Sequence, residues 1–209
     1  MRINTIRLRK WAGFLGMALP WIVAILIGYI PDSISATYYT NASTAFVIVL
    51  GAASMILISY KGYSKTDDIL LSCSGIAGFG ICLFPCSVTE DHVLVGTFVI
   101  DNYVSNALHY VFAIVFFLLL AYNSLFLFTK HSGEMTKRKK ARNVIFRVCG
   151  VGMVASFAIL LLPYFYAQTW ITEMIALTFF GISFLTKANI YPWLFCEPKT
   201  KNKEETNGN

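Results

Sequence analysis

Two titratable side chains stand near the starts of long apolar stretches, and both could do chemistry. His109 opens the stretch 107–129, and Glu173 opens the stretch 169–190. An imidazole can take up or release a proton near neutral pH, and a neighbouring carboxylate can orient it. The alternative is structural, because a histidine inside a helix bundle commonly bonds a neighbouring helix. Both residues open their stretches on the same side, so we expect them within hydrogen-bond reach, directly or through one water.

The segment between the first two apolar stretches is dense in hydroxyl and aromatic groups. It reads PDSISATYYTNAS and contains one carboxylate, Asp32. One interpretation is a solvated loop that caps the bundle, and the other is a loop folded inward over a cavity. Tyrosine favours the second, because its ring can be buried while its hydroxyl stays hydrogen-bonded. We therefore expect Tyr38 and Tyr39 to close a cavity above the last and fourth stretches, floored by His109 and Glu173. The predicted ligand-binding residues are Ser33, Ser35, Tyr38, Tyr39, Ser105, His109 and Glu173.

Three functions are compatible with these residues. The favoured one is non-enzymatic binding of a lipid headgroup or small amphiphile in an outward-facing cavity. The second is a metal-independent lipid-modifying enzyme, with His109 as general base and Glu173 or Asp32 orienting it. The third is a proton-coupled transporter that uses His109 and Glu173. A pocket of about 300 Å³ or more beside the two residues would favour a ligand; a closed bond without a cavity would favour a structural role.

Six apolar stretches must position these groups. Each is close to the 17–25 residues that cross a hydrocarbon core of about 30 Å, and spanning segments satisfy their backbone groups best as helices. The sequence therefore predicts an all-α bundle of six transmembrane helices in a single domain, 1–196, followed by a polar, disordered cytoplasmic tail, 197–209. The predicted spans are about 11–30, 44–60, 68–86, 107–129, 144–165 and 169–190.

All 17 Lys and Arg residues fall on one side of this six-span arrangement. Positive charge is retained in the cytoplasm during insertion, so both termini are expected there. The basic residues stand where insertion places them, which argues against a nucleic-acid partner and for membrane lipids. The expected location is an integral, multi-pass membrane protein, in the cytoplasmic membrane if the source is bacterial.

Charged residues near the inner ends of the stretches also have simple structural interpretations. Asp67 and Asp68 stand at the start of the third stretch, where a carboxylate caps free amides and complements the helix dipole. Lys187, near the end of the last stretch, is expected to snorkel to the membrane interface.

Four short motifs are spread over most of the chain. They are SIS-A-YY after the first stretch, YKGY closing the second, LHYVFA…FF…AY opening the fourth and E…FFGIS-L-K in the last. Together they resemble the DRAM-type group of six-helix membrane proteins and related bacterial families of unknown function. The group has an Ile-Ser-Asp-like motif after the first span, a His that begins the fourth, and a Glu that begins the sixth ahead of Phe-Phe-Gly. The matching residues here are Ile34, Ser35, His109, Glu173, Phe179, Phe180 and Gly181.

The resemblance implies a six-helix membrane fold but no settled chemistry. Eukaryotic members of the group are linked to lysosomal membranes, autophagy and remodelling of lipid anchors. Ala36 stands where the group has its acid, so any role of that acid is absent here unless Asp32 takes it over.

Ser105 and His109 are spaced as a Ser-x-x-x-His pair. The pair resembles one element of the ceramidase and adiponectin-receptor superfamily of membrane hydrolases, which add an Asp and further His residues to hold zinc. A catalytic zinc site uses three protein ligands and a water. The last spans contain no His, and His92 and His131 lie on opposite sides of the membrane in the predicted topology. No metal site and no cofactor are therefore expected.

Overall fold

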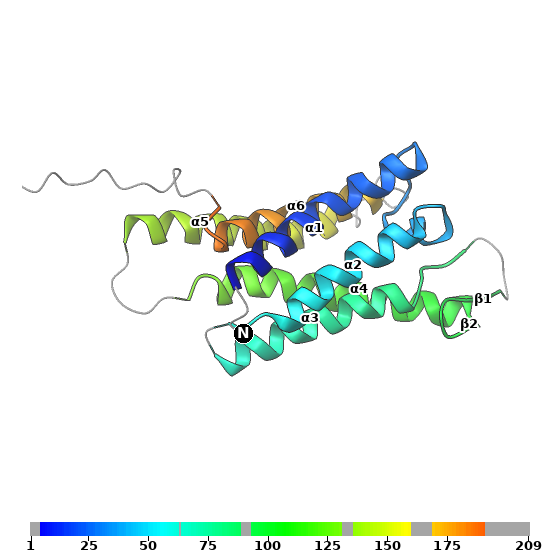
Figure 1. Cartoon of the computed structure of the whole chain (residues 1–209), viewed down its shortest axis with the longest axis horizontal. Helices are drawn as coiled ribbons and strands as arrows, with labels where there is room; N and C mark the ends of the chain where they lie inside the picture. The colour runs from blue at the N-terminus through cyan, green and yellow to red at the C-terminus, as the bar shows by residue number, and fades with distance from the viewer. Residues whose placement is uncertain (1–4, 63, 89–92, 131–135, 160–168, 191–209) are drawn as a thin grey trace, which may run out of the picture.

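The computed structural model describes residues 5–62, 64–88, 93–130, 136–159 and 169–190, and most of them are helical. Six long helices run antiparallel in chain order (Figure 1). Their bounds are α1 Thr5–Ile27, α2 Ser43–Ser59, α3 Lys65–Leu83, α4 Asn102–Tyr122, α5 Lys137–Ala158 and α6 Thr169–Lys187. The predicted all-α class is confirmed, apart from one two-residue hairpin, β1 Leu94–Val95 with β2 Ile100–Asp101. The predicted tail, 197–209, lies outside the described residues.

Membrane-spanning length is met by five of the six helices. These are α1, α3, α5, α6 and α4 with its continuation, each long and apolar enough to cross a membrane. The remaining helix, α2, is apolar but has only 17 residues. The helices therefore indicate a multi-pass membrane protein.

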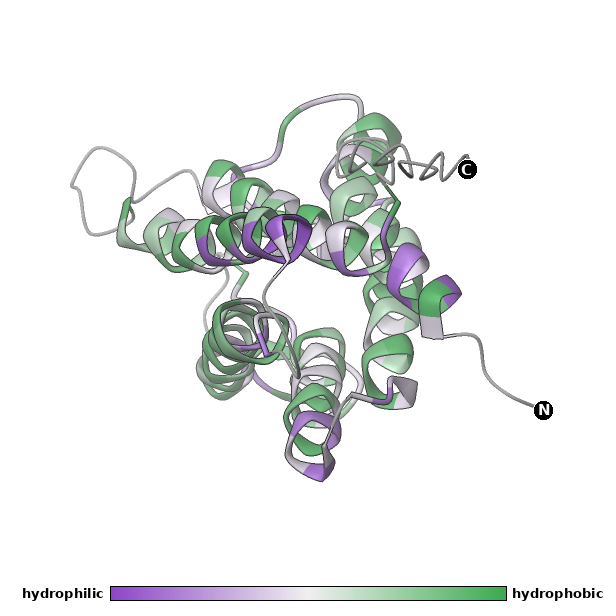
Figure 2. Cartoon of the chain, turned by 90° about the vertical axis from the view of Figure 1, so that its left-hand side faces the viewer, coloured by the Kyte–Doolittle hydropathy of each residue, from purple (hydrophilic) through white to green (hydrophobic). Residues whose placement is uncertain are grey.

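The helices form a bundle with one sparse seam. Each helix from α1 to α4 packs against the next, α5 packs against α6, and α6 returns against α1. The seam between α4 and α5 has much less contact. Figure 2 shows the bundle end-on, with hydrophilic residues gathered at the near helix ends and apolar segments behind them.

Because the helices alternate in direction, the Lys and Arg residues gather at one end of the bundle, here called the basic end, while Asp32, Asp101 and Glu173 lie at the other, here called the acidic end. The basic end is formed by the starts of α1, α3 and α5 and the ends of α2 and α6 (Figure 1). The acidic end is formed by the starts of α2, α4 and α6 and the ends of α1 and α3. The short 3-10 helix η1, Ser35–Tyr39, lies at the acidic end between α1 and α2.

A π-helical turn, η2 Asn123–Leu127, continues α4 toward the basic end. Its polar side chains are buried and tie together three other helices. Asn123 Nδ2 donates to Ser74 Oγ of α3 at 3.3 Å. Ser124 Oγ lies 2.7 Å from Ser183 Oγ of α6 and donates to the Phe146 carbonyl of α5 at 2.8 Å. The turn therefore supplies a buried polar layer that joins α3, α5 and α6.

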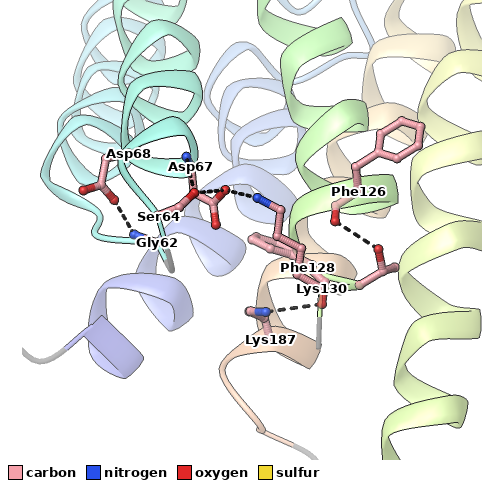
Figure 3. A network of polar contacts seen from close by, with 9 residues as sticks. Gly62, Ser64, Asp67, Asp68, Phe126, Phe128, Lys130 and Lys187 are labelled. Carbon is pink, nitrogen blue, oxygen red and sulfur yellow. Dashed lines mark hydrogen bonds and ion pairs between the residues drawn. The ribbon is translucent and has the colours of Figure 1, made fainter. Parts of the chain in front are cut away.

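The start of α3 is capped by a small charged network at the basic end (Figure 3). Ser64 Oγ accepts from the Asp67 amide at 3.3 Å and donates to Asp67 Oδ1 at 2.9 Å. Lys130 completes the network with an ion pair to the same oxygen. Asp68 Oδ1 accepts from the Gly62 amide at 2.6 Å. Both aspartates lie in the first turn of α3, where their charge complements the helix dipole as predicted, but the side chain that caps the Asp67 amide is Ser64.

Lys187 does not snorkel, so that prediction is wrong. Its side chain is buried at 5% exposure, and its Nζ donates to the carbonyl oxygen of Phe128 at 3.3 Å (Figure 3). Lys139 Nζ donates to the same oxygen at 3.0 Å. The carbonyls at a helix C-terminus lack intrahelical partners and carry partial negative charge, so they attract cations. The Lys187 ammonium also lies 5.0 Å from the centre of the Phe128 ring, within cation–π range.

Candidate ligand site at the acidic end

A cavity of about 430 Å³ lies among the helices near the acidic end. Its volume falls within the range of about 300–1,000 Å³ that is typical of small-molecule sites. The polar and titratable residues of its lining are Ser33, Ser35, His109, Thr169 and Glu173, together with Tyr110. The rest of its lining is apolar and comes from every helix: Leu19, Ile34, Phe46, Leu50, Ile81, Ala113, Ile114, Phe116, Phe117, Leu118, Met153, Val154, Phe157 and Leu177.

Glu173 is held by the loop that follows α1. Its carboxylate accepts from Ser33 Oγ at 3.0 and 3.3 Å and from the Ile34 amide at 2.6 Å. Ser33 Oγ also accepts from the Ser35 amide at 3.1 Å, which closes the turn into η1. Because these donors precede η1, the carboxylate complements the start of that short helix. The loop is thus folded inward against α6, as predicted, and Ser33 and Ser35 reach the cavity.

Asp32 contributes its backbone and not its carboxylate. The Asp32 carbonyl oxygen accepts from the Trp170 amide at 2.7 Å and from Thr169 Oγ1 at 3.1 Å. This satisfies an amide at the free start of α6. Asp32 is exposed and does not line the cavity. The structure therefore does not bring the Asp32 carboxylate to His109.

His109 bonds the end of α3 and not Glu173. Its Nδ1 lies 2.8 Å from the Phe84 carbonyl oxygen, and the side chain is only 4% exposed. A carbonyl oxygen only accepts, so Nδ1 carries the proton and Nε2 of the neutral ring is an acceptor. The predicted direct bond between His109 and Glu173 is wrong, although both residues line the same cavity. A bridge through one water stays a prediction.

Polar side chains on one face of α4 hydrogen-bond the backbone of the segment Phe84–Val88, which follows α3. Ser105 Oγ donates to the Pro85 carbonyl at 2.8 Å, one turn before His109. Asn106 Oδ1 accepts from the Ser87 amide at 3.0 Å. Asn102 bonds both the amide and the carbonyl of Val88, each at 3.1 Å. Ser105 therefore holds the segment Phe84–Val88 in place and does not line the cavity, so its predicted role in ligand binding is wrong. Asn102 and Asn106, which hold the same segment, were not predicted from the sequence. Their spacing with Ser105 and His109 (102, 105, 106, 109) places all four on one helix face and could have revealed them.

Tyr39 of η1 bonds the same segment. Tyr39 donates its hydroxyl to the Cys86 carbonyl at 2.6 Å, and its ring lies edge-on to Tyr38 at 5.3 Å. Neither ring lines the cavity. The expected closure of the cavity by the tyrosine pair is therefore wrong, and Ser33 to Ser35 form that wall instead. Partial burial, with Cys86 and Tyr38 nearby, raises the pKa of Tyr39 to about 12.

Cysteines and histidines form no metal cluster in the part of the chain that the structure describes. His92 and His131 lie outside that part. Cys82 and Cys86 are free thiols. Burial, and secondly the charge of Glu173, raises the pKa of the Cys86 thiol to about 12. Cys86 is therefore uncharged at neutral pH, and a thiol of this kind is a poor nucleophile.

Comparison of the chain with protein-family models, with curated proteins and with solved structures finds no match in any of the three.

Proposed function

We propose that the chain crosses the membrane six times with both termini in the cytoplasm. Five helices have sufficient length and hydropathy for this. The sixth, α2, would extend about 25 Å, slightly less than the hydrocarbon core of about 30 Å. Its flanking polar residues and the neighbouring helices make up the difference. The gathering of Lys and Arg at the basic end supports a cytoplasmic position for that end.

The topology predicts opposite labelling of two exposed positions. Thr97 lies in the hairpin turn at the acidic end, and Arg138 lies in the first turn of α5. In a variant whose native cysteines are replaced by serine, Thr97→Cys should react with a membrane-impermeant maleimide in intact cells. Arg138→Cys should react only after permeabilisation. The reverse pattern, or equal labelling of both in intact cells, would contradict the topology.

The cavity at the acidic end is proposed to bind a lipid headgroup or small amphiphile. The observation that carries this proposal is the combination of an apolar cavity of about 430 Å³ with polar groups from the η1 loop, α4 and α6. Such sites combine apolar lining with a few convergent polar groups that fix the orientation of the ligand. An amphiphile matches this division of the lining.

Catalysis has weaker support than binding. A general base needs an oriented ring and hydrogen-bond reach to the proton it removes. His109 is oriented by the Phe84 carbonyl at 2.8 Å, while the Glu173 carboxylate is bonded by Ser33 and Ile34. Neither carboxylate candidate, Glu173 or Asp32, bonds the imidazole. These separate contacts favour a binding protein over the lipid-modifying enzyme and the proton-coupled transporter.

Filling the cavity should remove the ligand without unfolding the protein. Ala113 lines the cavity, and Ala107 lies on an exposed face of the same helix. Ala113→Phe should weaken retention of amphiphile by at least tenfold, or about 1.4 kcal/mol, because the new ring occupies the space. The measurement is mass spectrometry of lipid extracted from protein purified in nonionic detergent. Ala107→Phe, the matched control, should retain the wild-type amount.

The proposal is wrong if Ala113→Phe and the wild type carry the same lipid in equal amount. Equal thermal unfolding midpoints for Ala113→Phe and Ala107→Phe would show that any loss comes from the site and not from the fold.

A further inference from the structure

We infer that the amphiphile bound at this site carries a protonated amine, which would lie against the Glu173 carboxylate. The inference rests on the proposed binding function and adds the chemical class of the ligand. Three features carry it: a carboxylate without a basic partner, an apolar cavity beside it, and an opening of that cavity toward the membrane-facing surface.

Glu173 has no Lys or Arg available to neutralise it. Residues 11–60, 66–129 and 148–186 contain no Lys or Arg, and they include the whole acidic end of the bundle. His109, which lines the same cavity, uses its Nδ1 on the Phe84 carbonyl and does not bond Glu173. The charge that the carboxylate carries when ionised is therefore unmatched within the described residues.

The carboxylate is hydrogen-bonded as an anion would be, yet it remains open to the cavity. Its donors are the Ser33 hydroxyl and the Ile34 amide, the latter at 2.6 Å, which is a short contact of the charge-assisted type. A carboxylate has about four lone-pair positions, so these donors leave room for another. Glu173 is partly exposed and lines the cavity. An anion in an apolar site is costly unless it is paired, and a cationic ligand would supply the pair.

The lining beyond the carboxylate fits a hydrocarbon chain. Phe117 and Phe157 lie on opposite sides of the α4–α5 seam and contact each other, with ring centres 4.6 Å apart. Met153 and Leu177 continue the apolar wall inside the bundle. No acceptor or donor in this part of the lining would bind a second polar group, so a single polar head at the Glu173 end is favoured.

The cavity reaches the outer surface of the bundle beside α4. Tyr110, Ile114 and Leu118 line it and are also 56%, 59% and 54% exposed, at intervals of four residues along one face. This face borders the α4–α5 seam, where the helices have the least contact among chain neighbours of the bundle. Since exposed apolar faces of these helices meet lipid, a hydrocarbon chain can pass between the cavity and the bilayer here. The membrane is then the source of the ligand.

The test compares three probes with the same twelve-carbon chain: dodecylamine, dodecanol and dodecanoate. The protein is placed in nanodiscs of phosphatidylcholine at pH 7, where the amine is protonated, and binding is measured by the change in tryptophan fluorescence, to which Trp170 and Trp21 contribute. These rings lie 5.9 Å apart, and Trp170 adjoins the Thr169 wall of the cavity. Dodecylamine should bind at least tenfold more tightly than dodecanol, and dodecanoate more weakly than either.

Two variants test whether Glu173 is the group that makes dodecylamine bind more tightly than dodecanol. Glu173→Gln should reduce dodecylamine affinity to the level of dodecanol and leave dodecanol unchanged. Asp32→Asn removes an exposed carboxylate at the same end that does not line the cavity, and it should leave the amine preference intact.

Each result decides between the two levels of the proposal. Equal affinity of the wild type for amine and alcohol, with both lost in Ala113→Phe, would overturn the amine inference and leave amphiphile binding standing. If Ala113→Phe binds all three probes as tightly as the wild type does, the signal reports only partition of the probes into the bilayer. That result would overturn both the amine inference and the proposed amphiphile binding. An amine preference that persists in Glu173→Gln but is lost in Asp32→Asn would place the cation outside the cavity and also overturn the inference.

Discussion

Replacing Gly75 by alanine should lower the midpoint of thermal unfolding in detergent by about 2–12 °C. A methyl group at Gly75 would lie 2.5 Å from the Ser54 carbonyl oxygen and 3.1 Å from the Ile58 amide nitrogen of α2. Those atoms belong to the backbone, so α3 would have to move away from α2. Overpacking of this kind costs about 1–3 kcal/mol, and in a chain of this size each kcal/mol shifts the midpoint by about 2–4 °C.

The matched control for this change is Gly51→Ala, on the facing helix of the same interface. A methyl group there would meet only the Phe79 ring at 3.7 Å, an ordinary contact. In a helix interior, alanine is also favoured over glycine by about 1 kcal/mol. Gly51→Ala should therefore keep or raise the midpoint. Equal midpoints for the two variants would mean that α2 and α3 do not approach as closely as the structure has them.

Hydrophobic patterning predicted the helical fold but not the helix ends. The fourth stretch was expected to begin at 107, whereas α4 begins at Asn102, where Asp101 accepts from the Tyr103 and Val104 amides. The fifth was expected at 144, whereas α5 begins at Lys137 with Thr136 as its cap. Hydropathy detects the part of a helix that meets hydrocarbon. It does not detect a polar first turn, which capping residues and good helix formers such as Lys and Arg can extend beyond the membrane.

The candidate site was predicted in its residues more fully than in its contacts. His109, Glu173, Ser33 and Ser35 do line one cavity. A direct bond between His109 and Glu173 did not form, because each residue has a backbone partner instead. Backbone carbonyls at helix ends and amides in turns are strong partners, and every residue except proline carries both. Residue types therefore reveal which side chains need a partner, but not which backbone group will meet them.

The prediction that Lys187 reaches the membrane interface was wrong for a related reason. A lysine near the end of an apolar stretch ordinarily extends toward water. Here η2 ends at the Phe128 carbonyl, which accepts from Lys187 and Lys139 together. The π-helical turn that precedes it has no periodic signature in the sequence, because it shifts the register of α4 by a single residue.

The second large effect is expected from Asn102→Ala, which should destabilise the protein by about 2 kcal/mol or more. Asn102 is 2% exposed and bonds both the amide and the carbonyl of Val88. Alanine would leave both backbone groups of the half-buried Val88 without these bonds, and each lost bond costs about 1 kcal/mol. Thermal unfolding gives the total loss, and hydrogen exchange at the Val88 amide should show it locally as faster exchange.

A comparison with Asn106→Ala shows whether this loss of stability comes from the two bonds between Asn102 and Val88. Asn106→Ala removes a single bond, to the amide of the exposed Ser87, and should cost less than half as much. Because the Phe84 carbonyl that orients His109 belongs to the same segment, loosening it by Asn102→Ala should also weaken amphiphile retention, although Asn102 does not line the cavity. If Asn102→Ala lowers stability while leaving retention at the wild-type level, the segment supports the fold alone, and the orientation of His109 has no part in holding the ligand.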